Sequence, residues 1–75
     1  MRERALALMR QYRWIEFGQD GDNSLWRLGD AAMTIEPNGD WRTQIPTGIT
    51  MSIASGTINN LEDFLRQFAA TNPRQ

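Results

Sequence analysis

The chain has 75 residues and a formal net charge of −1, and its eight basic residues are all arginine. It contains no cysteine, histidine or lysine, which excludes disulfides, thiolate metal sites, histidine acid–base catalysis and Schiff-base chemistry. The small net charge gives no overall attraction to nucleic acid or to an anionic membrane. A chain of this length buries only roughly 60–65% of its unfolded surface, so residues 1–75 are expected to form a single small domain.

The sequence also bears on where the protein resides. The apolar run Ala5 to Met9 is too short for the core of a signal peptide, and no small-residue cleavage site follows it. No segment approaches the roughly 20 apolar residues of a membrane span. We therefore expect a cytoplasmic protein that does not bind membranes.

The N-terminal segment predicts a helix over residues 3–13. Ala5, Leu8, Met9 and Tyr12 recur at the spacing of one helical face. The alternating segment WIEFG predicts a first strand over residues 14–18.

In that first strand, Ile15 and Phe17 are expected to face the core. The expected register pairs Phe17 with Trp26 and Ile15 with Leu28. Trp14 is then expected on the open face, unless the junction with the helix covers it.

Four more strands are expected over residues 24–28, 31–36, 40–45 and 49–54, joined by turns with different chemistry. Gly29-Asp30 suits a two-residue type II′ turn. Pro37-Asn38-Gly39 and Pro46-Thr47-Gly48 both favour a three-residue turn with a bulge at glycine.

These turn types fix a register that can be compared with the apolar pattern. The expected pairs include Trp26 with Met33, Ile35 with Trp41, and Thr43 with Met51. Like side chains then meet like along every strand. The face expected to be apolar carries Trp26, Leu28, Ala31, Met33, Ile35, Trp41, Thr43, Ile45, Ile49, Met51 and Ile53.

The C-terminal segment predicts a helix over residues 59–70, with an apolar stripe of Leu61, Phe64, Leu65 and Phe68. Asn59 or Asn60 is expected to cap it, and a frayed tail is expected over residues 71–75. The fold class is therefore α+β, in the order α-β-β-β-β-β-α. A five-stranded antiparallel meander in strand order 1-2-3-4-5 should carry both helices on one face, as a two-layer sandwich.

Four acidic residues are expected to gather at one rim of this sheet, beside its turns: Asp20, Asp22, Glu36 and Asp40. The rim suggests either a cation site or a patch for a basic partner, although aspartate is also common in ordinary turns. Carboxylate catalysis would in addition require a cleft. We therefore expect no enzyme activity, no catalytic residues, no metal site, no cofactor and no small-molecule substrate.

The face opposite the helices is expected to present Arg27, Arg42, Thr34 and Gln44. Arginine and aromatic side chains on an open antiparallel sheet are typical of proteins that bind single-stranded nucleic acid. Here that function is the alternative hypothesis, because two arginines beside several acids also fit a solvated polar face.

The fifth strand leads to the preferred hypothesis. No charged residue occurs between Thr43 and Leu61, although edge strands usually carry charges that prevent further pairing. The strand is either covered within the monomer or available to another strand. We expect a small non-enzymatic interaction protein (a regulator, inhibitor or accessory subunit). It would bind a protein partner or itself through Ile49, Thr50, Met51, Ser52 and Ile53, or through the open face.

Overall fold

The first helix, α1 (Arg2–Gln11), begins the part of the chain that the computed structural model describes, residues 2–71. It buries Ala5, Leu8 and Met9, which are three of the four residues of the expected apolar stripe. The fourth, Tyr12, follows the helix and is partly buried against the core. The expected tail at 71–75 lies outside the described residues except for Thr71, which ends the last helix.

A Schellman motif ends α1 two residues earlier than the periodicity predicted. Trp14 N–H donates to Met9 O at 2.9 Å, and Arg13 N–H donates to Arg10 O at 3.0 Å. Arg13 occupies the left-handed position of the motif, with φ 70°. The motif turns the chain so that Trp14 points into the core.

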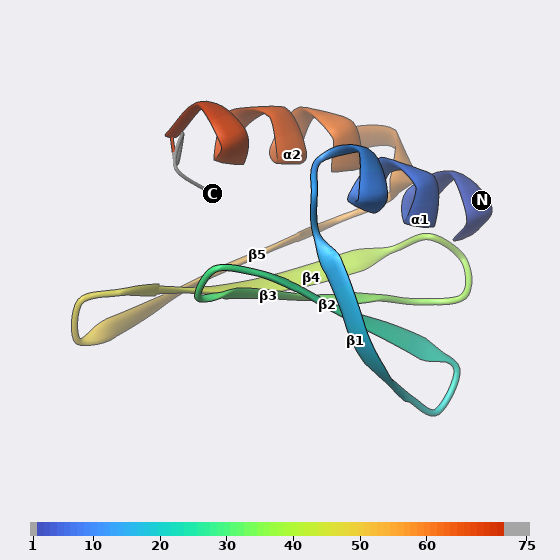
Figure 1. Ribbon diagram of the computed structural model, residues 1–75, viewed down its shortest axis with the longest axis horizontal. Coiled ribbons are helices and arrows are strands. Elements are labelled where there is room, and N and C mark those ends of the chain that lie inside the picture. The colour runs from blue at the N-terminus through green and yellow to red at the C-terminus, as the bar shows by residue number, and fades with distance from the viewer. Residues whose placement is uncertain (1, 72–75) are drawn as a thin grey trace.

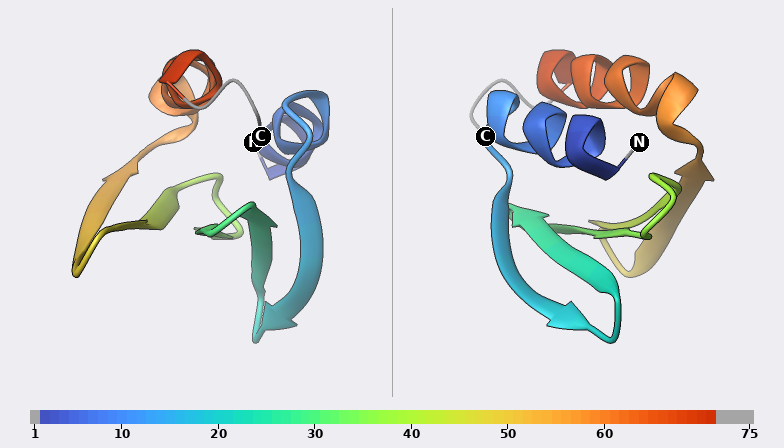
Figure 2. Two further views of the ribbon diagram at one scale, coloured as in Figure 1. Left: turned by 60° about the vertical axis from the view of Figure 1, so that its left-hand side comes forward. Right: turned by 90° about the vertical axis from the view of Figure 1, so that its right-hand side faces the viewer.

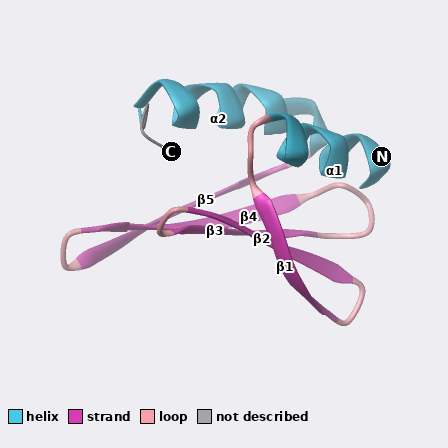
Figure 3. Cartoon of the chain, viewed as in Figure 1, coloured by secondary structure: helices cyan, strands magenta, loops and turns pink. Residues whose placement is uncertain are grey.

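The sheet has five antiparallel strands in the order β1-β2-β3-β4-β5, as predicted. The strands are β1 (Ile15–Asp20), β2 (Asn23–Leu28), β3 (Ala31–Ile35), β4 (Trp41–Thr47) and β5 (Thr50–Gly56). The sheet twists strongly, and the β1–β2 hairpin bends away from the helices (Figure 1). The fold is therefore the predicted α+β arrangement, in which an antiparallel meander carries the N-terminal and C-terminal helices on one face (Figure 3).

The registers of the two central ladders are confirmed. Trp26 pairs with Met33 across β2 and β3, and Ile35 pairs with Trp41 across β3 and β4. The turn at Pro37-Asn38-Gly39 closes as expected, with Gly39 N–H donating to Glu36 O at 2.9 Å. Two inward side chains of these strands, Leu28 and Ile45, are partly buried. Six others are fully or almost fully buried: Trp26, Ala31, Met33, Ile35, Trp41 and Thr43.

The predicted register between β4 and β5 is wrong by three residues, because Thr43 pairs with Ala54 and not with Met51. The turn has two residues, Gly48 and Ile49, between the pair Thr47 and Thr50. Gly48 adopts a left-handed φ of 70°, and the two threonine hydroxyls lie 2.8 Å apart. A slip by an odd number of residues moves every side chain of a strand to the other face. Ile49, Met51 and Ile53 are therefore exposed, and not in the core as expected.

Packing around Trp41 explains why β5 adopts this register. Trp41 lies opposite Gly56, and its indole N–H donates to Thr57 O at 2.9 Å. The small residues Ala54 and Gly56 leave room for the indole where β5 passes under the start of the second helix. An isoleucine opposite Trp41, as the predicted register required, would overfill that space.

The predicted placement of the first strand is also wrong. Ile15 pairs with Arg27 and Glu16 with Trp26, and the ladder then shifts so that Gly18 pairs with Leu25. This irregularity leaves Phe17 between paired positions, as in a β-bulge. Ile15 and Phe17 are exposed, whereas Trp14 is 3% exposed and takes the core position expected of them.

The second helix, α2 (Ile58–Thr71), packs beside α1 on one face of the sheet (Figure 2). It buries Ile58, Leu61, Leu65 and Phe68. Phe68 contacts Trp14, with ring centroids 5.4 Å apart. The core therefore lies between the helix pair and the sheet, in a molecule with a Cα radius of gyration of 11.5 Å.

Charged side chains bridge the two helices at the surface. Glu62 of α2 contacts Arg4 of α1 and Arg66 of α2, each at 3.6 Å. A hydrogen bond with Tyr12 is the main cause that raises the pKa of Arg66 above its ordinary value. These groups are largely exposed, so they contribute little to stability.

The N-terminus of α2 is capped by Thr57, and not by Asn59 or Asn60 as predicted. Asn59 N–H donates to Thr57 Oγ1 at 3.3 Å, and Thr57 N–H donates to Asn60 Oδ1 at 2.9 Å. This reciprocal arrangement is a capping box with asparagine in the return position. Trp41 Nε1 also donates to Asn60 Oδ1 at 3.2 Å, which ties the cap to the core.

Neither helix within residues 2–71 is long and apolar enough to cross a membrane.

Candidate protein-binding edge

Strand β5 forms one edge of the sheet and pairs with β4 along its other side. None of its residues, Thr50–Gly56, carries a charge. Charges, prolines and bulges are the usual features that prevent an edge strand from pairing with another chain. The β5 edge has none of these features.

The ladder with β4 decides which backbone groups of β5 point outward. Thr47 and Thr50 flank a two-residue turn, so Thr50 directs its backbone groups toward β4. The direction of the backbone groups alternates from one residue to the next, so the backbone groups of Ser52 and Ala54 also point toward β4. The amide and carbonyl groups of Met51, Ile53 and Ser55 are then directed away from the sheet.

Apolar side chains lie on the same edge. Met51 is 51% exposed, Ile53 is 66% exposed, and Ile49 at the turn is fully exposed. Met51 and Ile53 project from the face opposite the helices, because cross-strand partners share a face and their partners Pro46 and Gln44 lie on that face. Of the expected β5 residues, Thr50 and Ser52 are exposed too, but they alternate with Met51 and Ile53 and lie on the helix side of the sheet.

The predicted open-face residues do lie together on the open face. One row across the sheet contains Arg27, Ala32 and Gln44, which are aligned by the ladders, and the next contains Thr34 and Arg42. The first row ends at Ile53 on the β5 edge and at Ile15 on the β1 edge. The open face is therefore basic and polar at its centre and apolar at both edges.

The β1 side of this face carries an aromatic residue that the sequence reasoning missed. The guanidinium of Arg27 lies 5.9 Å from the centroid of the Phe17 ring, and both side chains are exposed. This distance is within the range of a cation–π contact. The bulge in β1 turns Phe17 to the open face, and the Gly18 that follows it was the available signal.

The β1 edge differs from the β5 edge in its charges and regularity. Glu16 and Asp20 lie on the strand, and the ladder is irregular at Phe17. Glu16 also accepts a hydrogen bond from Ser24 Oγ at 2.5 Å. These features protect the β1 edge in the usual way.

The four residues of the predicted acidic rim lie at one end of the sheet without forming a metal site. Asp20 and Asp22 belong to the β1–β2 hairpin tip, and Glu36 and Asp40 flank the β3–β4 turn. The two tips point apart (Figures 1 and 2). No group of three acidic side chains within residues 2–71 could hold a metal ion.

Asp40 has a role in its own turn. Its backbone N–H donates to Asn38 Oδ1 at 3.0 Å, and Asn38 Nδ2 donates to its carboxylate at 3.1 Å. Such local hydrogen bonds are ordinary turn chemistry.

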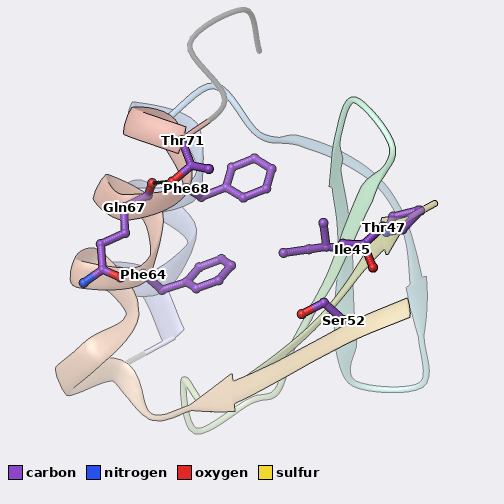
Figure 4. Close-up of a pocket in the computed structure, with 8 residues that line it drawn as sticks. Ile45, Thr47, Ser52, Phe64, Gln67, Phe68 and Thr71 are labelled. Carbon is purple, nitrogen blue, oxygen red and sulfur yellow. Dashed lines mark hydrogen bonds between the residues drawn. The ribbon is translucent and has the colours of Figure 1, made fainter. Parts of the chain in front are cut away.

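A pocket of about 380 Å³ lies on the helix side of the β5 edge. Phe64 and Phe68 point into it from α2, and Ile45 points toward them from β4 (Figure 4). The space exists because β5 presents the small Ser52 there and not Met51 or Ile53. The other lining residues are Pro46, Thr47, Gln67 and Thr71.

Comparison of the chain with protein-family models, with curated proteins and with solved structures finds no match.

Proposed function

We propose that this chain is a non-enzymatic protein-binding module that recruits a β-strand of its partner to the β5 edge. The observation that carries the proposal is the combination, on one edge, of an uncharged strand with the exposed apolar side chains Met51 and Ile53. Added strands gain affinity from main-chain hydrogen bonds and specificity from side chains on alternate faces.

The chemistry of the two sheet faces supports this function. A strand added beside β5 would continue the open face next to Met51 and Ile53, which would then be covered on one side. Its alternate side chains would lie beside Ser52, at the mouth of the pocket lined by Phe64 and Phe68. An apolar, uncharged partner strand fits both sides.

The test compares three forms of the chain in capture experiments from the native cell: wild type, Ser52→Lys and Gln19→Lys. Ser52→Lys places a charge on the β5 edge, whereas Gln19→Lys places the same charge on the β1 edge. We expect wild type and Gln19→Lys to retain a partner, or a second copy, that Ser52→Lys loses. If Ser52→Lys keeps its fold by circular dichroism and retains every partner, β5 is not the binding edge.

Single-stranded nucleic-acid binding on the open face is the second candidate function. It is favoured by the exposed Phe17 ring beside Arg27, with Arg42 on the same face. Bases stack on aromatic rings, and arginine contacts phosphate. The acidic residues at the end of the sheet act against this function.

A binding titration with mixed oligonucleotides at low salt separates the two functions. Nucleic-acid binding predicts an affinity that falls steeply with salt and is lost in Phe17→Ala and Arg27→Gln. Ser52→Lys, which leaves the open face unchanged, should not reduce it. Absence of measurable binding at low salt would reject this second function.

A further inference from the structure

The two edges of the sheet differ in their ability to pair with a copy of themselves. In a twofold interface each residue near the axis meets itself or a close neighbour, so a charge there meets its own copy. Glu16 and Asp20 would create like-charge contacts between two β1 edges. Strand β5 has no charge to oppose self-pairing.

We propose that the partner of β5 is a second copy of this chain, paired antiparallel about a twofold axis at Ser52. This inference rests on the proposed function and names its partner. The register brings Met51 of one copy opposite Ile53 of the other, twice across the axis. A twofold axis at Ile53 would instead place Met51 opposite Ser55, with one apolar pair in place of two.

Backbone geometry agrees with an axis at Ser52. The outward-directed groups of Met51 face those of Ile53 in the other copy, so each pair can exchange two hydrogen bonds. Ser52 directs its backbone groups toward β4, so the two Ser52 residues form a non-hydrogen-bonded pair. The Cα atoms of such a pair lie about 4.5 Å apart.

The resulting dimer would have one ten-stranded sheet. Cross-strand partners point to the same face, so both pairs of helices would lie on the same side of it. The exposed Met51 and Ile53 side chains of both copies would meet at the centre of the open face. Pairing would therefore cover the apolar strip that the single chain leaves exposed.

Cysteine cross-linking tests the axis directly, because the chain has no native cysteine. A Cα separation of about 4.5 Å permits a disulfide, so Ser52→Cys should form covalent dimers under mild oxidation. Ser55→Cys is the matched control, an exposed serine on the same strand. In the proposed register the two Ser55 residues lie roughly 20 Å apart, six residues along the strand.

Rapid cross-linking of Ser52→Cys, with slow cross-linking of Ser55→Cys, supports the inference. Equal rates for the two variants, or no covalent dimer for Ser52→Cys, would overturn it. Sedimentation equilibrium adds a second measurement: wild type should approach twice the 8.6 kDa chain mass in the micromolar range. The Ser52→Lys variant should remain at the mass of one chain.

Failure of this inference can be distinguished from failure of the proposed function. A wild-type chain that stays monomeric, yet captures another protein through a contact that Ser52→Lys abolishes, rejects the second copy and keeps the binding edge. A chain whose interactions are all insensitive to Ser52→Lys rejects both.

Discussion

Met51 lies opposite Pro46 across the β4–β5 ladder, and this pairing determines on which face of the sheet each side chain of β5 lies. In the register expected from the sequence, Met51 would lie opposite Thr43 and point into the core. The pair with Pro46 places Met51 on the open face and leaves Ser52 beside the pocket. The β4–β5 register therefore gives rise to both the candidate interface and the pocket.

An engineered disulfide distinguishes the two registers. Pro46→Cys with Met51→Cys should form an intrachain disulfide readily, because the residues form a directly opposed, non-hydrogen-bonded pair. Thr43→Cys with Met51→Cys should not, because those side chains lie on opposite faces. Mass spectrometry of dilute oxidised protein reads out both. A disulfide in the second variant alone would establish the register in which Met51 lies opposite Thr43.

The sequence predicted the central ladders correctly because two independent signals agreed there. Gly29-Asp30 has one favoured turn type, and the register it sets pairs apolar residues with apolar residues. Pro37-Asn38-Gly39 behaves in the same way. At Pro46-Thr47-Gly48 the same signals also agreed, but tertiary packing overrode them.

The expected β4–β5 register fails because α2, and not the strands, sets the space beside Trp41. The indole reaches Thr57 and Asn60, so only small residues of β5 fit beside it. No local pattern in Thr50–Gly56 contains that information. The position of β5 at the edge was predictable from strand order, whereas the face of its apolar side chains was not.

The first strand was misjudged for a related reason. Alternation alone placed Ile15 and Phe17 in the core, but the Schellman motif directs Trp14 there first. The bulge then changes the parity along β1. The open-face positions of Arg27, Arg42, Thr34 and Gln44 were predictable because they depend on the two central ladders.

Arg13→Gly should stabilise the protein. Arg13 occupies the left-handed region at the end of α1, where a side chain costs about 1 kcal/mol or more and glycine costs less. We expect a gain of about 0.5–1 kcal/mol in the free energy of unfolding, measured with urea. Gln11→Gly, at the last residue of α1, is the control and should lower the stability, because glycine is a poor helix former. A destabilised Arg13→Gly variant would contradict the assigned cap.

Asn60→Ala should destabilise the protein by about 1–2 kcal/mol. The change removes the acceptor for Thr57 N–H and one acceptor for Trp41 Nε1. Asn59→Ala is the matched control, because it leaves both of these hydrogen bonds in place. Equal effects of the two substitutions on thermal unfolding would show that Asn60 does not complete the cap.

Ile35→Ala and Ile53→Ala should differ strongly in their effect on the single chain. Ile35 is completely buried, so its truncation should cost about 2–5 kcal/mol. Ile53 is exposed, and its truncation should cost less than about 0.5 kcal/mol at high dilution. Chemical denaturation over a dilution series measures both. A large, concentration-independent loss for Ile53→Ala would place that side chain in the core.

The central claim is that a second chain pairs along β5, and amide hydrogen exchange measured over a range of protein concentrations tests it most directly. The outward amides of Met51, Ile53 and Ser55 should exchange quickly at low concentration and become protected as concentration rises. The outward amide of Gln19 on β1 should show no such change. Exchange at Met51, Ile53 and Ser55 that is independent of concentration, or protection that appears on β1 instead, would contradict the claim.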